Sequence, residues 1–262
     1  MSTTLTDAKL ARIVVETSGS VARIALQNPP LNVIDIPMME QLQRALAEIE
    51  ANAAIAAIVI SGMGKAFSAG VDVAAHTPDK VEEMLARFHG VIRALIATKK
   101  VTTAAVHGHC LGGGAELAMV CDLVYTTDEA QWGFPEIKLG CYPPVACTAL
   151  AALVGQKRAA DLILTGRTIT GREAAEIGLA TSSVPQSELS RAVDDSLSRL
   201  MGLSPAALAI AKKASYAWDS MHFDKGLAHA EKIYFEDLMK TADANEGIRA
   251  FMEKRSPKWT GK

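Results

Sequence analysis

The sequence predicts an α/β fold with parallel crossovers, and two observations lead to this prediction. Between residues 12 and 126, short β-branched and apolar runs alternate with longer segments whose apolar residues recur at helical spacing. After Pro143, helix-like segments follow one another with glycine or proline between them. We therefore expect an α/β body over residues 1–200 and a helical region over residues 201–262.

The first part of the chain predicts the order strand, strand, helix, strand. Residues 12–16 and 21–26 are β-branched and apolar, and the turn-rich segment 17–20 between them predicts a hairpin. Apolar residues then recur at helical spacing over residues 38–49, and the apolar run at residues 55–60 is typical of a buried strand. A helix between two buried strands favours a parallel pair.

The same alternation continues to residue 126, and helices dominate afterwards. Three glycines, Gly112 to Gly114, separate a strand from the helix that follows it. The further strands are expected at residues 101–106 and 123–126, and the further helices at residues 78–97, 115–122, 146–154, 159–164, 172–177, 189–201, 205–218 and 227–239.

Charge and hydropathy exclude several classes of protein. Lys and Arg total 27 against 29 Asp and Glu, so the net charge is -2 and the basic surface that nucleic acid requires is not expected. The longest apolar run, residues 53–60, is far shorter than the roughly 18 residues of a membrane span. The start MSTTLTDAKL lacks the layout of a secretion signal, and the four cysteines form no CxxC pair. We expect a cytoplasmic protein without disulfides.

The loop SGMGKAFSAGVDV, which follows the strand expected at residues 55–60, is rich in small residues. Such a loop leaves backbone N–H groups close to whatever binds against it. The phosphate-binding pattern GxxxxGK[ST] fails, because Val59 stands at its first glycine position and Ala66 follows Lys65. An ordinary turn between strand and helix is the other interpretation of this segment.

The segment HGHCLGGGAELAMVCDLVY runs from a strand through three glycines into a helix. The first N–H groups of a helix are unpaired and favour negative charge, so this turn predicts an anion site. Donors from this turn and from the turn at residues 69–71 could converge on one oxygen and form an oxyanion hole. The alternative is a glycine turn needed only for close packing of helix and strand.

Two glutamates near these loops form a possible acid/base pair. Glu116 stands in the first turn of the glycine-led helix, where the helix N-terminus favours its ionised form, as a general base requires. Glu136 lies in WGFPE, where burial by two aromatic residues and a proline would raise its pKa, as a proton donor requires. A surface glutamate or a helix-capping ion pair is the alternative for each. His107 and His109 alternate at a strand end, but no third ligand has suitable spacing, so no metal is expected.

Taken together, FSAGVDV and AAVHGHCLGGGAELAMVCDLVYTTDEAQWGFPEIKLG closely resemble the enoyl-CoA hydratase/isomerase (crotonase) superfamily. The resemblance extends from NPPLNVID at residues 28–35 to AFMEKRSPKW near the end of the chain. It implies a spiral of ββα units followed by a C-terminal helical trimerisation region, assembled as a homotrimer or a dimer of trimers.

The resemblance also implies roles for individual residues. The backbone N–H groups of Val71 and Gly113 match the oxyanion-hole donors that hold the thioester oxygen. Glu116 and Glu136 match the two catalytic glutamates of the hydratases, with Glu116 taking the proton of the attacking water and Glu136 protonating the α-carbon. Hydration of an α,β-unsaturated acyl-CoA is therefore favoured, with CoA as part of the substrate and no other cofactor.

Further positions match the part of the family that surrounds CoA. Ala69, Asp72 and Val73 fall where the loop encloses the adenine and thioester ends, and Lys254 matches a basic residue that reaches the CoA phosphates. An enoyl-CoA isomerase is the enzymatic alternative. A non-catalytic acyl-CoA-binding or RNA-associated protein on the same scaffold is the alternative from another class.

The sequence departs from ordinary short-chain hydratases after the second glutamate. Residues 141–146 read CYPPVA where those hydratases carry a glycine-rich stretch, and Val101 and His107 replace a proline and an asparagine. The prolines stiffen the turn and Tyr142 adds bulk, so we expect a reshaped acyl pocket. CYPPVA, together with NPPLNVIDIPMM and AGVDVAAHTPDKVEEML, resembles the cyclic dienoyl-CoA hydratases of anaerobic aromatic degradation, which act on cyclohexa-1,5-diene-1-carbonyl-CoA.

Overall fold

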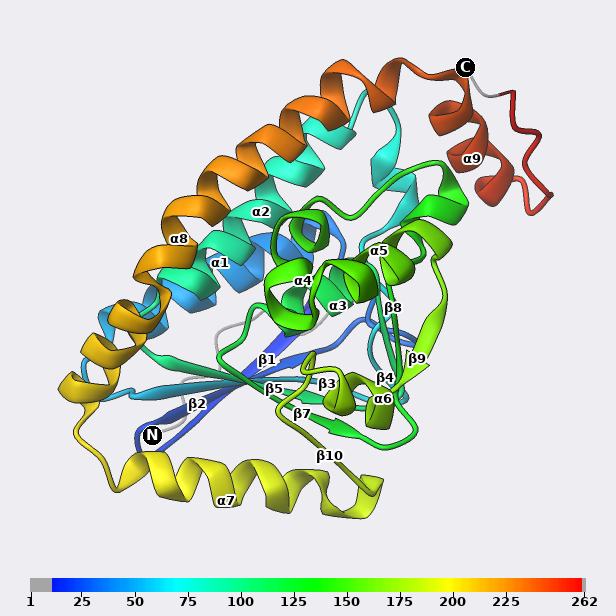
Figure 1. Cartoon of the computed structure of the whole chain (residues 1–262). Helices are drawn as coiled ribbons and strands as arrows, with labels where there is room; N and C mark the ends of the chain where they lie inside the picture. Colours follow the sequence, from blue (N-terminus) through cyan, green and yellow to red (C-terminus); the bar gives the residue numbers. More distant parts are fainter. Residues whose placement is uncertain (1–10, 261–262) are drawn as a thin grey trace.

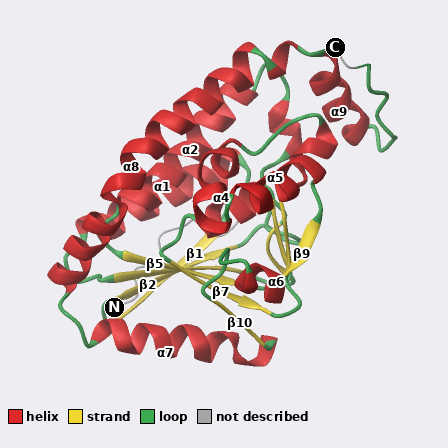
Figure 2. Cartoon of the chain, viewed as in Figure 1, coloured by secondary structure: helices red, strands yellow, loops and turns green. Residues whose placement is uncertain are grey.

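The computed structural model describes residues 11–260, apart from the side chains of residues 216–222. The segment MSTTLTDAKL lies outside the described residues. Two β-sheets lie at the centre of the molecule, and helices surround them (Figures 1 and 2). The predicted α/β class is confirmed.

Six strands form the larger sheet, in the order β1-β2-β3-β5-β7-β10. The antiparallel pair β1 and β2 is the predicted hairpin, and every other neighbouring pair is parallel. The strands are β1 (Ile13–Ser18), β2 (Val21–Leu26), β3 (Ala57–Gly62), β5 (Val101–Val106), β7 (Leu123–Thr127) and β10 (Ser182–Val184). Side chains alternate along these strands. Ile58 and Ile60 belong to the main core with the helices α1 (Ile36–Ala51) and α2 (Val81–Ala97), whereas Val59 belongs to a second core with the helix α7 (Leu189–Met201).

A smaller sheet has the order β4-β6-β8-β9, and the sequence pattern predicted none of its strands. Its strands are β4 (Ala66–Ser68), β6 (His109–Leu111), β8 (Gln131–Gly133) and β9 (Thr168–Thr170). The first three are mutually parallel and β9 is antiparallel to β8. Strands of three residues are too short to show the alternation on which strand prediction depends.

The elements follow one another as ββα units, as the resemblance implied. In the second to fourth units, the first strand enters the larger sheet, the second enters the smaller sheet, and a helix returns the chain. The helices are α1 (Ile36–Ala51), α2 (Val81–Ala97), α3 (Gly113–Met119), α4 (Pro144–Val154), α5 (Gln156–Thr165), α6 (Gly171–Glu176), α7 (Leu189–Met201), α8 (Pro205–Glu236) and α9 (Ala242–Met252). Short 3₁₀ helices lie at Val73–His76 (η1), Pro135–Leu139 (η2), Gln186–Glu188 (η3) and Leu238–Lys240 (η4).

The prediction of two separate helices at residues 205–218 and 227–239 is wrong, because the single helix α8 runs through both ranges. Gly226, which suggested a break, lies against α4: a Cβ on it would come within 2.8 Å of the Thr148 side chain. The glycine therefore permits close packing of α8 on α4. In Figure 1, α8 crosses the molecule diagonally, and it packs against α2 and α4. A separate oligomerisation region over residues 201–262 stays a prediction.

A nearly buried ion pair attaches the first half of α8 to the larger sheet. Asp122, which follows α3, accepts hydrogen bonds from the backbone N–H of Thr102 at 2.7 Å and from its hydroxyl at 3.0 Å. The Lys212 ammonium lies 2.8 Å from the same carboxylate oxygen, and the two charged side chains are only 8% and 13% exposed. Thr102 and Lys212, which bond to this Asp122 oxygen, are therefore both largely shielded from water.

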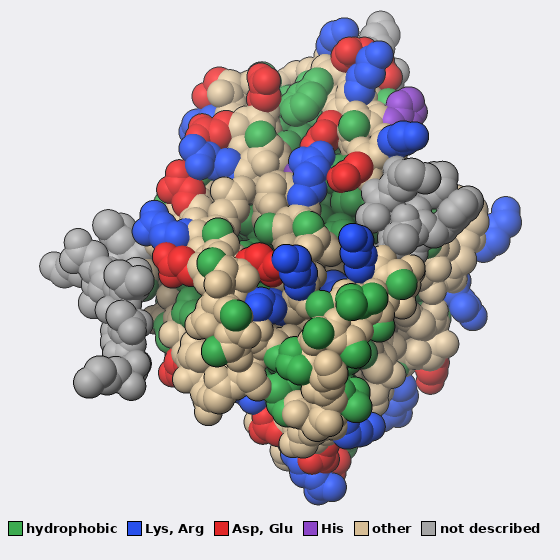
Figure 3. Space-filling view, turned by 90° about the vertical axis from the view of Figure 1, so that its left-hand side faces the viewer, with side chains coloured by type: hydrophobic (Ala, Val, Ile, Leu, Met, Phe, Trp, Pro, Cys, Tyr) green, Lys and Arg blue, Asp and Glu red, His purple; other side chains and the backbone are tan. Residues whose placement is uncertain are grey.

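No helix in the described residues is both long and apolar enough to cross a membrane. In the face drawn in Figure 3, basic and acidic side chains are interspersed, and hydrophobic side chains gather in its lower middle part. This face has no continuous basic surface.

Replacing Lys212 with Met should leave the Asp122 carboxylate buried without its counter-charge. We expect the free energy of unfolding to fall by about 2 to 3 kcal/mol, as measured by urea denaturation at fixed protein concentration. Lys213→Met is the matched control, because Lys213 is exposed on the next position of α8. Equal stability of the two variants would contradict the role given to the ion pair.

Candidate active site

Three strand ends of the smaller sheet bring the predicted site residues together. Val71 follows β4, Gly113 follows β6 and Glu136 follows β8. These strands are parallel neighbours, so their carboxyl ends lie at one edge of the sheet. The backbone N–H of Gly112 donates to the carbonyl of Gly133 at 2.9 Å, which holds two of these ends side by side.

The two expected oxyanion-hole donors are close neighbours. Gly113 is the first residue of α3, so its N–H has no acceptor within the helix. Val71 and Ile34 form a parallel bridge, in which the two residues on either side of Val71 make the hydrogen bonds to Ile34. The N–H of Val71 itself therefore points away from Ile34. A Cβ on Gly113 would lie 3.3 Å from the Val71 nitrogen. Both residues line one small cavity of about 70 Å³.

Gly112 is required by its surroundings. Its φ is +51°, a left-handed conformation that side chains rarely adopt. A Cβ at this position would lie 2.5 Å from Oε1 of Glu136. The absence of a side chain therefore allows the second carboxyl group to lie directly against the start of α3.

Glu116 is buried in α3, with 3% of its surface exposed. Its Oε1 accepts a hydrogen bond of 2.9 Å from the backbone N–H of Ala146, in the first turn of α4. Pro144 occupies the first position of that helix, where no N–H is needed. The unusual CYPPVA segment thus directs the N-terminus of α4 at one of the two catalytic candidates.

The expectation that Glu116 has a lowered pKa is wrong. Burial raises the pKa of Glu116 from 4.5 to about 7, although the backbone N–H groups of Ala146 and Val145 act in the opposite direction. Removing water destabilises the charged form of Glu116 by more than the N–H groups at the N-terminus of α4 stabilise it.

The expected rise in the pKa of Glu136 is confirmed. Burial is the larger cause and repulsion by Glu116 the second, and the pKa lies well above its usual 4.5. The aromatic residues that line the cavity are not the two near Glu136 in the sequence. Trp132 and Phe134 are buried in the core and do not line the cavity, whereas Phe88, Tyr142 and Tyr234 do.

The structure places some of the remaining predicted residues at the cavity and others away from it. Ala69, Val73 and Tyr142 line the same cavity as the two glutamates. Asp72 instead caps η1, where its carboxylate accepts from the backbone N–H of Ala74 at 3.1 Å. Lys254 is exposed just after α9 and is not among the residues that line the cavity.

The pattern of the sequence missed several residues of the cavity wall, among them Met84, Tyr234 and Ile248 from α2, α8 and α9. Tyr234 is 1% exposed, and its hydroxyl lies against the Cys141 thiol. Oε2 of Glu136 is buried and has no hydrogen-bond partner within the described part of the chain. Helical spacing of apolar residues marks the buried face of a helix, but it does not distinguish core from cavity wall.

Two cysteines near the site have thiols whose pKa values are raised. Burial raises the pKa of Cys141 to about 11 and that of Cys147 to about 12, and the negative carboxyl groups nearby add to both shifts. These thiols therefore stay protonated near neutral pH, and a thiolate nucleophile is not available.

Comparison with known proteins agrees with this geometry. The sequence profile described as enoyl-CoA hydratase/isomerase matches residues 16–262. A cyclohexa-1,5-dienecarbonyl-CoA hydratase of Thauera aromatica is 35% identical over 250 residues, which cover 95% of this chain and 96% of the relative. A probable enoyl-CoA hydratase of Mycobacterium bovis is 36% identical over 251 residues, covering 95% and 97%.

Solved structures give the same result. The crystal structure of an enoyl-CoA hydratase from Mycobacterium avium subsp. paratuberculosis has a TM-score of 0.87 at 26% identity, covering 96% of this chain and 99% of that chain. An enoyl-CoA hydratase from Bacillus anthracis has a TM-score of 0.77 at 30% identity, covering 96% and 100%. The chain belongs to the enoyl-CoA hydratase/isomerase family. The expectation of an enzyme of the hydro-lyase type is confirmed at this level.

Replacing Glu116 with Gln should change how stability depends on pH. The folded protein binds the Glu116 proton more tightly than the unfolded chain does, so the free energy of unfolding of the wild type falls as pH rises from 4.5 to about 7. The variant lacks this fall while its amide oxygen keeps the bond to Ala146. We expect it to exceed the wild type by about 1 to 3 kcal/mol at a pH of about 8 and to match it at a pH of about 4.

Urea denaturation at the two pH values measures this difference. Glu82→Gln, on the exposed surface of α2, is the control and should change stability equally at both. A Glu116→Gln variant that is less stable than the wild type at the higher pH would contradict the prediction.

Proposed function

We propose that this protein adds water across the α,β double bond of an acyl-CoA thioester. The observation that carries the proposal is that one cavity is lined by two buried carboxyl groups and by Val71 and Gly113, whose backbone N–H groups have no acceptor in the described residues. These are the groups that hydration of a conjugated thioester requires: a base, an acid and donors for the developing negative oxygen.

In the proposed reaction, Glu116 takes a proton from water as the water oxygen bonds to the β-carbon. The electron pair of the double bond moves onto the thioester, whose oxygen becomes an enolate held by the N–H groups of Val71 and Gly113. Glu136 then gives its proton to the α-carbon and the carbonyl reforms. After this step Glu116 carries the proton taken from water, and Glu136 has lost its own proton to the product. Moving one proton from Glu116 to Glu136 returns the two glutamates to their starting protonation states.

The electrostatics of the pair support these roles. The pKa of Glu116 is about 7, so a large share of this group is ionised near neutrality. Ionised Glu116 repels negative charge on Glu136, which helps to keep the second group protonated. One base and one acid then coexist at neutral pH, although burial raises the pKa of both.

The proposed substrate is a cyclic dienoyl-CoA of the type found in the breakdown of aromatic compounds, cyclohexa-1,5-diene-1-carbonyl-CoA. Two observations support it: the relative from Thauera aromatica carries the name of such a hydratase, and the bulky Tyr142 and the stiff turn after it line the cavity. A compact flat ring suits this wall better than a long flexible chain does.

The CoA portion is proposed to lie along Ala69, Asp72 and Val73, with Lys254 near its phosphates. The reaction then uses no cofactor beyond the CoA of its own substrate. Assembly as a homotrimer or a dimer of trimers, and a place in the cytoplasm, complete the proposal.

Glu116→Gln and Glu136→Gln should each lower the turnover number for hydration by about 100- to 10,000-fold, because each removes one proton-transfer step. Loss of absorbance of the conjugated thioester measures the rate, and incorporation of heavy oxygen from labelled water distinguishes hydration from double-bond isomerisation. Glu129→Gln, exposed in the turn between β7 and β8, is the control. Turnover that is unchanged in both site variants, or product without the label, would overturn the proposed reaction.

The substrate is tested by comparing cyclohexa-1,5-diene-1-carbonyl-CoA with crotonyl-CoA under the same conditions. We expect a kcat/KM at least about tenfold higher for the cyclic ester, because one poorly filled pocket commonly costs that much. A clear preference for crotonyl-CoA would reject the cyclic substrate and leave hydration itself in place.

A further inference from the structure

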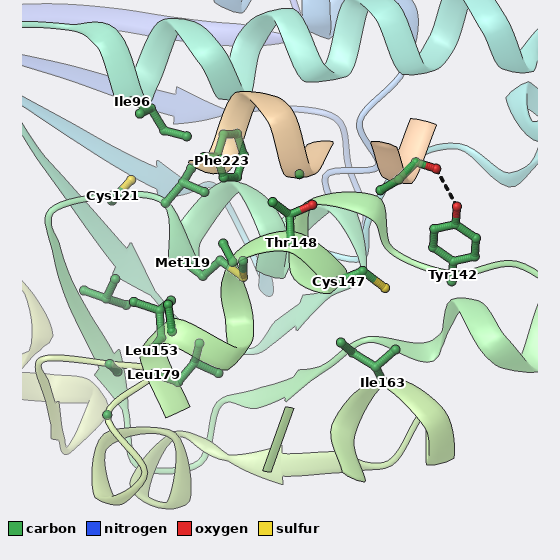
Figure 4. A pocket seen from close by; sticks show the side chains of 18 of the residues that line it. Ile96, Met119, Cys121, Tyr142, Cys147, Thr148, Leu153, Ile163, Leu179 and Phe223 are labelled. Atoms are coloured by element: carbon green, nitrogen blue, oxygen red, sulfur yellow. Dashed lines mark hydrogen bonds between the residues drawn. The ribbon is translucent and has the colours of Figure 1, made fainter. Parts of the chain in front are cut away.

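A second, much larger cavity lies beside the catalytic one. Its volume is about 850 Å³, and side chains of α3, α4, α5 and α8 form its walls. In Figure 4, Met119, Leu153, Ile163 and Phe223 surround this space with carbon and sulfur atoms. A cavity of this size and apolar lining is suited to a long hydrocarbon chain, whereas the catalytic cavity holds only about 70 Å³.

The two cavities adjoin at the turn that precedes α4. Tyr142 lines both of them. Cys147, five residues further along the chain, lines the larger cavity, and the charges of Glu116 and Glu136 affect its thiol. The larger cavity therefore begins close to the two glutamates of the proposed reaction.

Tyr142 is fixed in this wall from two sides. Its hydroxyl donates a hydrogen bond of 2.6 Å to the carbonyl of Ala230 on α8, drawn as a dashed line in Figure 4. Its ring packs edge-on against Tyr234, with 5.2 Å between the ring centres. The adjoining Glu231 bonds His89 of α2 at 2.6 Å, so this turn of α8 is itself held in place.

We propose that Tyr142 sets the upper limit on the acyl group, because it closes the catalytic cavity against the larger one. Acyl groups that fit in front of the Tyr142 ring are accepted, and long chains are rejected because they meet the ring and its bond to α8. The inference rests on the proposed action on acyl-CoA thioesters. It adds a specificity-determining role to a residue that takes no part in proton transfer.

Tyr142→Ala should join the two cavities. Measured with trans-2-enoyl-CoAs of increasing length, from crotonyl to dodecenoyl, kcat/KM for the longest esters should rise at least about tenfold relative to crotonyl-CoA. Tyr142→Phe keeps the ring and removes only the bond to Ala230, so its rise should be smaller. Adding Ala149→Phe to Tyr142→Ala narrows the larger cavity and should remove part of the gain for long esters.

Ala149→Phe alone tests the wall in a protein that keeps Tyr142. It should leave the chain-length profile unchanged, since no substrate of the wild type reaches the larger cavity. Reduced turnover of long esters in this variant would show that the cavity is already in use and would overturn the inference. An unchanged profile in Tyr142→Ala would overturn it equally, provided the thermal unfolding temperature shows that the variant is folded.

The outcome is separable from the proposed hydration. Calorimetric binding of saturated acyl-CoAs of the same lengths compares the variants without any turnover, and it should show the same gain for long chains in Tyr142→Ala. If crotonyl-CoA and the cyclic ester are both left unhydrated by the wild type, hydration is wrong, and the binding series still decides the role of Tyr142.

Discussion

The shared carboxyl edge of three very short parallel strands is the constraint on which the site depends. β4, β6 and β8 contribute three residues each, yet their pairing brings Val71, Gly113 and Glu136 to one place from positions up to 65 residues apart in sequence. The larger sheet and its helices supply the buried area that makes this arrangement stable. The smaller sheet aligns the proposed donors with the proposed acid.

Several features of the site lower the stability of the folded protein. Two carboxyl groups are buried close enough to repel each other, and Oε2 of Glu136 has no hydrogen-bond partner in the described residues. Each of these features disfavours the folded state. In the proposed reaction, the protonated Glu136 carboxyl finds its partner in the substrate.

Much of this architecture is predictable from sequence, and the exceptions have physical reasons. The hairpin and the buried strand at Ala57–Gly62 follow from side-chain alternation and apolar runs, which are local properties. The smaller sheet is not predictable in this way, because three residues show no period. Gly226 suggested a break where it instead allows two helices to approach. The pKa of Glu116 was misjudged because position in a helix is visible in sequence, whereas depth of burial depends on elements such as α4.

The continuity of α8 has a consequence for how this enzyme can change over generations. Lys212, bonded to the larger sheet, and Ala230, bonded to Tyr142, lie on one uninterrupted helix about 27 Å apart. Both contacts therefore belong to one helical element, and a substitution that shifts α8 near Lys212 is expected to shift the Ala230 carbonyl as well. Under the role proposed for Tyr142, the range of substrates can then change through substitutions at the far end of α8, while Glu116 and Glu136 stay as they are.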